Sequence, residues 1–174
     1  LSIAGVPVGA GIRGAEPCIA LSETSGEPAT NDVPRCGAKS STGPAPERPE
    51  LGSIIVVPAT DAPLLPHQLK RLAKRVALGV GRMGGIGGDS SGDIFMAFST
   101  SNPGAANPDS VATVRMLPNN RINGLFEATV DATEEAIVNA LVAVETMTGA
   151  NGYRVYSLPT DQVLSLLRKA GRVR

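Results

Sequence analysis

Apolar residues along this chain gather into short runs separated by glycine, proline and polar residues. Residues 54–57 are a continuous run of β-branched side chains, and similar short runs cover 93–99, 111–117 and 153–158. Branched and aromatic side chains pack well on a pleated surface, so each run predicts a strand, and the first two predict buried strands. The neighbouring runs 93–99 and 111–117 predict an antiparallel hairpin.

Three helices are predicted between and after these strands. Apolar residues recur at helical spacing over 66–83, 122–147 and 160–170, and the adjacent pair of glutamates at 134 and 135 leaves open whether the second helix is continuous. Thr160 is a candidate N-cap of the last helix, and Gly171 is a candidate stop. The order strand, helix, strand, strand, helix, strand, helix predicts a layered α+β domain.

The first third of the chain has a different character. Residues 10–50 show no period of 2 or 3.6 and are rich in proline, glycine and polar residues. They predict a linker or loop without a core, which we expect to be mobile and dispensable for folding. Cys18 and Cys36 lie there without other ligands at metal spacing, so no zinc site is expected. A disulfide between them is an alternative, and two free thiols are the favoured interpretation.

Charge and composition exclude several function classes. The 174 residues carry 16 Lys and Arg against 16 Asp and Glu, and aromatic residues make up only 3%. A neutral chain with few aromatic side chains does not favour nucleic acid or an acidic membrane as partner. Neither a long apolar span nor a leader is visible, which predicts a cytoplasmic location, although Leu1 suggests part of a longer chain.

Two other features of the predicted helix 66–83 carry little functional weight. Its basic residues predict a solvated outer face: Lys70, Arg71, Lys74, Arg75 and Arg82. The motif Gly79-Val-Gly-Arg-Met-Gly84 resembles a dinucleotide fingerprint, but it closes a helix instead of opening one after a strand. His67, the single histidine, is expected to face solvent at the helix start, so a Ser-His-Asp triad is not expected.

Candidate chemistry lies at the entrances of the first two strands. Ser53 follows Gly52 directly before the β-branched run, and Ser91 and Asp93 stand two residues apart before the next strand. A serine freed at its amino group combines a nucleophile and a base in one residue. Side chains two apart in an extended backbone share a side, so Ser91 and Asp93 could handle a proton together. All four residues are also ordinary turn residues, and spacing alone leaves both interpretations open.

Longer stretches resemble the DmpA-type aminopeptidases, the self-processing L-aminopeptidase/D-amidase-esterases that are relatives of the β-peptidyl aminopeptidases. The resemblance covers nearly all of 53–174 and rests on these motifs in the family's order: Gly52-Ser-Ile-Ile-Val-Val, Ala59-Thr-Asp-Ala-Pro-Leu-Leu-Pro-His-Gln-Leu-Lys-Arg-Leu72, Ser91-Gly-Asp-Ile-Phe-Met-Ala-Phe-Ser-Thr100 and Phe126-Glu-Ala-Thr-Val-Asp-Ala-Thr-Glu-Glu-Ala-Ile-Val-Asn-Ala-Leu141. Residues 1–9 resemble a further family segment, and 10–50 match nothing in it.

The resemblance implies an αββα sandwich of the DmpA and ornithine-acetyltransferase type, of which this chain is the C-terminal portion. It implies self-cleavage between Gly52 and Ser53, with 1–52 as the end of the α part plus a linker and 53–174 as the catalytic β part. Ser53 would be the nucleophile, supported by Ser91 and Asp93, where relatives carry a longer Glu. The family needs no metal or organic cofactor, and it forms homo-oligomers.

The expected activity is release of N-terminal residues from short peptides, amides or esters. The family's carbonyl-polarising asparagine and tyrosine lie in an upstream α region, which we expect to be this chain's partner. Two alternatives remain: an acyltransferase like the ornithine acetyltransferases, which carry threonine where Ser53 stands, and an inactive structural fragment.

Overall fold

The computed structural model describes residues 1–20, 36 and 52–174. They fall into two compact units: a terminal unit from residues 1–48 and 137–174, and a ribbon unit from residues 49–136. The predicted division at residue 52 concerns a backbone cut and not packing, so it stays a prediction. Among the described residues we find no helix with the length and hydropathy of a membrane span.

A two-stranded parallel ribbon forms the sheet of the ribbon unit. β2 (Ile55–Val56) pairs with β4 (Ile94–Phe95), and β3 (Ala59–Thr60) pairs with β5 (Phe98–Ser99). The amides of residues 94, 96, 98 and 100 donate to the carbonyls of residues 54, 56, 58 and 60 at 3.0–3.1 Å. Pro58 has no N–H to return a bond, which explains why each strand is split into two short pieces. The strands predicted over 53–61 and 93–99 are therefore present, and they pair with each other.

The ribbon is half-buried on one face and exposed on the other, so the prediction of two buried strands is wrong. Side chains alternate along both strands, and the outward ones form an exposed apolar face: Ile55, Val57, Ile94, Met96 and Phe98. Ile55 is 68% exposed and Ile94 is 56% exposed. Alternation is the normal consequence of a period of two when helices cover a single face.

The predicted antiparallel hairpin is also wrong, because residues 111–117 form no strand. The Asn102 side chain takes both backbone groups of Arg115: its Oδ1 accepts from the Arg115 N–H at 2.9 Å, and its Nδ2 donates to the Arg115 carbonyl at 3.2 Å. A side-chain amide thus occupies groups that strand pairing would need. The only neighbour of 93–99 within the described sheet is the parallel strand pair β2 and β3.

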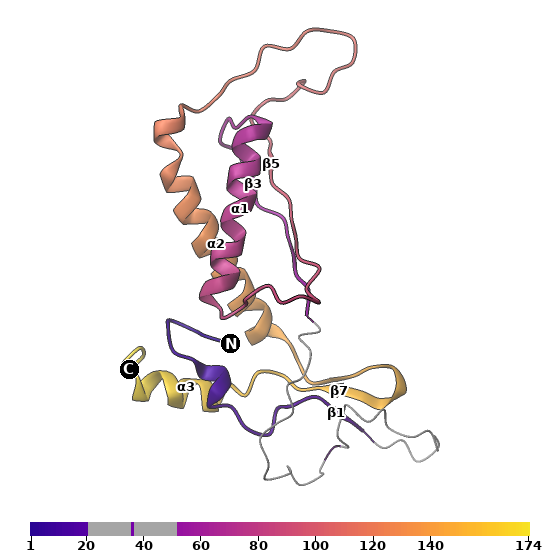
Figure 1. The fold of residues 1–174 in the computed structure, drawn as a ribbon, viewed down its shortest axis with the longest axis vertical. Coiled ribbons are helices and arrows are strands. Elements are labelled where there is room, and N and C mark those ends of the chain that lie inside the picture. The colour runs from indigo at the N-terminus through magenta and orange to yellow at the C-terminus, as the bar shows by residue number, and fades with distance from the viewer. Residues whose placement is uncertain (21–35, 37–51) are drawn as a thin grey trace. The chain divides into compact units, whose positions relative to one another are not determined.

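Two helices cover the inner face of the ribbon (Figure 1). α1 (Pro66–Arg82) and α2 (Asn123–Ala143) match two predicted helices, and α2 is continuous through residues 134 and 135. A short 3₁₀ turn, η2 (Asn119–Arg121), precedes α2. Buried apolar side chains join the helices to the segments before them: Leu64, Leu72, Ile122 and Phe126. Gln68 is fully buried here, and its Nε2 donates to the Leu117 carbonyl at 2.8 Å.

Gly79 lets α1 and α2 approach closely. A Cβ built on Gly79 would lie 2.7 Å from the Thr133 Cβ and 2.8 Å from the Val130 carbonyl oxygen. Gly81 also lies in α1, so the glycine motif closes a helix, as predicted. The glycine at position 79 therefore has a packing role.

The basic face of α1 is only partly solvated, contrary to the prediction. Arg75 stacks over the Phe126 ring at 4.0 Å from guanidinium carbon to ring centroid, and Arg71 lies 5.2 Å from the same centroid. Arg82 donates to the Asp131 carboxylate at 2.6 Å, and this hydrogen bond raises the pKa of Arg82. The guanidinium groups therefore bind α2, because a cation over an aromatic face is attracted by the ring.

The terminal unit holds a small antiparallel sheet and one helix. β7 (Tyr153–Val155) lies between β1 (Cys18–Ile19) and β6 (Met147–Thr148) in the sheet. A 3₁₀ turn, η3 (Ala150–Gly152), joins β6 to β7. α3 (Thr160–Lys169) packs on η1 (Val8–Ala10) through a core of Val8, Val163 and Leu167. Figure 1 shows β1 beside β7.

Several predictions for this unit need correction. Cys18 and Cys36 form a disulfide, with their Cα atoms 5.0 Å apart, so the favoured prediction of free thiols is wrong. Cys18 is also buried within β1, so 10–50 is not without core residues, whereas the expected mobility of 21–35 and 37–51 lies outside the described residues. α2 ends before residue 147, which belongs to β6. Thr160 makes no cap, while Gly171 follows α3 at a φ of 66°.

Candidate active site

Ser53 stands at the entrance of the ribbon with its side chain exposed. It lies two residues before Ile55, and Gly92 lies two residues before Ile94, the residue paired with Ile55. The parallel register therefore places Ser53 opposite Gly92. The Gly92 N–H donates to Ser53 Oγ at 2.8 Å, which fixes the hydroxyl against the neighbouring strand.

Ser91 and Asp93 flank Gly92 in the chain, and their side chains point to the opposite face of the ribbon from that of Ser53. Asp93 Oδ1 accepts from Ser91 Oγ at 2.7 Å and from the Ile54 N–H at 3.0 Å. The predicted placement of Ser91 and Asp93 on one side is therefore confirmed. Hydrogen bonds to a carboxylate are shorter and stronger than neutral ones, so Asp93 anchors the backbone directly after Ser53.

The structure thus brings Ser53, Ser91 and Asp93 together from two strand entrances. The direct contact to the Ser53 hydroxyl, however, comes from the Gly92 backbone and not from Ser91 or Asp93. The sequence did not indicate Gly92, because any residue other than proline has a backbone N–H that could donate this bond. Its position between Ser91 and Asp93 is the one signal that could have indicated it.

Gly52 precedes Ser53 and is exposed. A Cβ built on Gly52 would meet no atom of the described residues within 4 Å, so the space beside the Gly52 Cα is open there.

The single histidine is remote from a catalytic arrangement. His67 is the second residue of α1 and is exposed, as predicted. No group of three His, Cys, Asp or Glu side chains within the described ranges is arranged to hold a metal ion.

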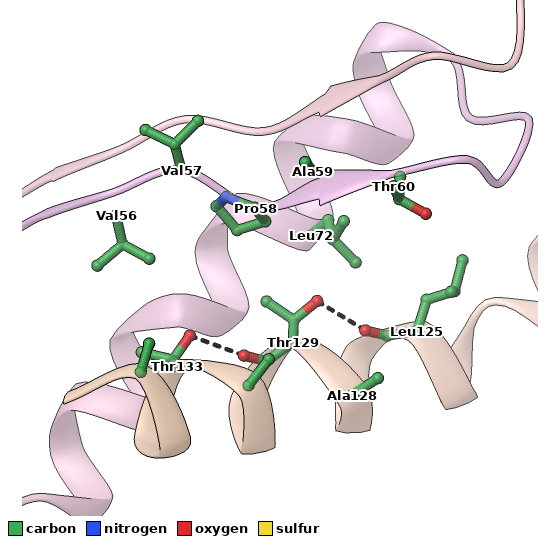
Figure 2. Close-up of a pocket in the computed structure, with 12 residues that line it drawn as sticks. Val56, Val57, Pro58, Ala59, Thr60, Leu72, Leu125, Ala128, Thr129 and Thr133 are labelled. Atoms are coloured by element: carbon green, nitrogen blue, oxygen red, sulfur yellow. Dashed lines mark hydrogen bonds between the residues drawn. The ribbon is translucent and has the colours of Figure 1, made fainter. Parts of the chain in front are cut away.

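A cavity of about 340 Å³ lies between α2 on one side and β2 and β3, the strands that follow Ser53, on the other (Figure 2). Apart from Leu125 at one end, its α2 wall is made of small side chains: Ala128, Thr129, Ala132, Thr133 and Ala136. Both threonine hydroxyls donate at 2.7 Å to carbonyls one turn earlier in the helix, as Figure 2 shows. The wall therefore presents methyl groups, and the cavity suits apolar side chains.

Comparisons with known proteins point in one direction. The sequence profile of Peptidase family S58 matches residues 1–155. The chain belongs to this family. Beta-peptidyl aminopeptidase BapA of Sphingosinicella microcystinivorans is 48% identical over 177 residues, covering 99% of this chain and 40% of that protein. Its namesake in Sphingosinicella xenopeptidilytica is 44% identical over 171 residues, covering 97% of this chain and 38% of that protein.

Solved structures agree with this membership of family S58. The L-aminopeptidase D-Ala-esterase/amidase of Ochrobactrum anthropi, described as a serine aminopeptidase with a variant Ntn hydrolase fold, superposes with a TM-score of 0.73 at 37% identity. That match covers 100% of this chain and 40% of the other. A Burkholderia beta-aminopeptidase gives a TM-score of 0.63 at 47% identity over 73% of this chain and 37% of that one. The chain thus spans about 40% of the length of the relatives it matches.

Proposed function

We propose that this chain carries the nucleophile of a serine aminopeptidase that cuts its own backbone between Gly52 and Ser53. The observation that carries the proposal is the Ser53 hydroxyl, which accepts from the Gly92 amide at 2.8 Å and follows directly after an exposed glycine. The relatives named as aminopeptidases support a hydrolase and do not favour the acyltransferase alternative.

Self-cleavage is an acyl shift followed by hydrolysis. Ser53 Oγ attacks the Gly52 carbonyl carbon, a C–O bond forms, and the C–N bond to Ser53 breaks. The hydroxyl proton goes to the departing nitrogen, which becomes the free amine of Ser53. Water then opens the ester, leaving a carboxylic acid on Gly52 and restoring the Ser53 hydroxyl.

Turnover uses the same oxygen on a substrate. The freed α-amine of Ser53 has a reference pKa of about 7.7–8.0, so near neutral pH a fraction is uncharged and can take the hydroxyl proton. Ser53 Oγ bonds to the carbonyl carbon of the substrate's first residue, and the proton passes to the leaving amine. Hydrolysis of the acyl-enzyme ester releases that residue. This sequence needs no cofactor.

Ser91 and Asp93 act as positioning residues in this scheme. Asp93 binds the Ile54 amide, and Ser91 donates to the same carboxylate oxygen. Their bonds hold the strand entrance, so that Ser53 Oγ keeps its position when the bond between Gly52 and Ser53 breaks. The Asp93 side chain is long enough to reach the Ile54 amide, at 3.0 Å.

We propose that the complete fold is the αββα sandwich. The ribbon presents an apolar face that the described residues leave exposed, including Phe98 at 48% and Met96 at 58% exposure. Apolar patches of this kind mark surfaces that pack on something else. A second sheet packed on this face would bury it between two layers of strands.

We further propose that an upstream part of the same precursor is this chain's partner. On the outer edge of β2 and β3, the backbone groups of alternate residues, such as Val57, face away from β4 and β5, and the methyl-lined cavity lies beneath this edge. An added strand would satisfy these groups and fill the cavity. Homo-oligomer formation stays a prediction from the family resemblance.

Intact-mass analysis of the precursor tests the cleavage step. We expect a fragment that begins at Ser53, an uncut Ser53→Ala variant, and a cut Ser53→Cys variant, because a thiol can make the same acyl shift. Processing of Ser53→Ala at the parent rate would mean that another protease makes the cut and that Ser53 is not the nucleophile.

Release of p-nitroaniline from alanine p-nitroanilide tests the activity and the partner together. We expect little activity from this chain alone and at least about a hundredfold more with the family's upstream region, because one missing oxyanion donor costs roughly 10²–10³ in kcat. No activity in the assembled protein would favour the structural-fragment alternative.

A further inference from the structure

We propose that Gly92 determines how much bulk Ser53 accepts beside the reacting carbonyl, by leaving one side of the Ser53 hydroxyl open. The inference rests on the proposed role of Ser53 as nucleophile. It concerns acyl groups with branching at the carbon next to the carbonyl.

The register of the ribbon makes position 92 the nearest cross-strand neighbour of Ser53. A Cβ built on Gly92 would lie 3.4 Å from Ser53 Oγ, and within the part of the chain that the structure describes this oxygen is the only atom within 4 Å outside the chain neighbours of Gly92. Any side chain at position 92 would therefore cover the hydroxyl and little else.

The backbone does not require glycine at this position. Gly84 and Gly87 in the preceding loop have φ of 91° and 61°, values that other residues rarely adopt, whereas Gly92 is not among the residues with positive φ. An alanine at position 92 keeps the amide that donates to Ser53 Oγ. The variant Gly92→Ala thus changes the space around the hydroxyl without removing its hydrogen bond.

The substrate carbonyl must approach through the space beside Ser53 Oγ. A carbonyl carbon ready for attack lies roughly 3–3.5 Å from the nucleophilic oxygen. A methyl group 3.4 Å from the oxygen occupies the same shell. An acyl group without substituents can shift aside, but one branched next to its carbonyl meets the methyl first.

The test compares kcat and KM for glycyl, alanyl and valyl p-nitroanilides in the protein assembled with its upstream region. In Gly92→Ala we expect kcat/KM for the valyl substrate to fall about tenfold or more relative to the glycyl substrate. Gly81→Ala is the matched control, because a Cβ on Gly81 meets no atom within 4 Å, and its substrate ratios should equal those of the parent. An unchanged valyl-to-glycyl ratio in Gly92→Ala overturns the inference.

Two further measurements distinguish a failure of the proposed function of Ser53 from a failure of the inference about Gly92. Loss of all three activities in Ser53→Ala upholds the proposed function, whereas retained activity refutes it whatever position 92 does. If Gly92→Ala does not fold, the space beside Gly92 is measured in the variant Ser53→Cys, which keeps Gly92. The rate of alkylation of its thiol is compared for iodoacetamide and for the branched homologue 2-iodopropanamide. An open side predicts the same rate ratio as for free cysteine within about threefold, and a tenfold bias against the branched reagent overturns the inference.

Discussion

The Asp93 carboxylate binds the backbone amide of Ile54 at 3.0 Å, one residue beyond the proposed nucleophile. The same oxygen also accepts from the Ser91 hydroxyl. Asp93 therefore acts on Ser53 through the chain, by fixing the strand entrance, and not by touching its hydroxyl. This contact gives the carboxylate a role that can be measured in the self-cleavage step.

We expect Asp93→Asn to slow self-cleavage by about tenfold or more. The amide keeps the shape of the side chain but loses the charge, and hydrogen bonds to charged groups contribute roughly 1.5–3 kcal/mol against about 1 for neutral ones. The cleaved fraction is followed over time by gel electrophoresis. Asp89→Asn is the control, because Asp89 is exposed in the same loop. Cleavage of Asp93→Asn at the parent rate would exclude this positioning role.

The two glycines in α1 should respond in opposite directions to alanine. Gly79→Ala places a methyl group 2.7 Å from the Thr133 Cβ, so we expect it to lower the free energy of unfolding by about 1–3 kcal/mol. Gly81→Ala meets open space in a helix and should raise that free energy by about 0.5–1 kcal/mol. Urea unfolding measures both. A Gly79→Ala variant as stable as the parent would show that the helices can separate at no cost.

The sequence predicted the elements better than it predicted their pairing. The β-branched run 54–57 indicated a strand and the helical period of 66–83 indicated a helix, and both are present, whereas the strand predicted over 111–117 is absent. The parallel pairing of 53–61 with 93–99 is set by distant residues, and the hairpin failed because the Asn102 side chain takes the backbone of Arg115. The disulfide was missed for the same reason, since two cysteines alone do not show whether their Cα atoms meet.

Part of the candidate site could be predicted from the types and positions of its residues. Ser53, Ser91 and Asp93 were predicted as site residues from their places at strand entrances and from the family resemblance, and the structure brings them close together, while their roles stay a prediction. The hydrogen bond from Gly92 was not foreseen, because it comes from a backbone amide. The exposure of Ile55 and Ile94 was also missed, since an apolar run does not show what covers it.

The Cys18–Cys36 disulfide should stabilise the terminal unit. Replacing both residues, as Cys18→Ser with Cys36→Ser, should lower the free energy of unfolding by roughly 3 kcal/mol, the amount expected for closing a loop of this size. Urea unfolding with and without reductant measures the effect, and the double variant should be insensitive to reductant. A parent protein that is alkylated on two thiols in denaturant without reductant would contradict the disulfide.

The same bond makes the predicted cytoplasmic location testable. Disulfides persist in oxidising compartments and are rare in the reducing cytosol. Alkylating intact cells before lysis, then measuring the mass, distinguishes the two cases. Two alkylated cysteines would support the cytoplasmic prediction, and none would contradict it.

The pH dependence of catalysis should report the α-amine of Ser53. The amine accepts a proton only when it is uncharged, so kcat/KM should rise with pH and level off above an apparent pKa of about 7.7–8.0, the reference range for an α-amine. The measurement is the pH profile of alanine p-nitroanilide hydrolysis by the assembled protein. His67→Gln should leave the rise in place, because His67 is exposed at the start of α1 and contacts none of the three site residues. A rise with pH that disappears in His67→Gln would instead identify the imidazole as the base.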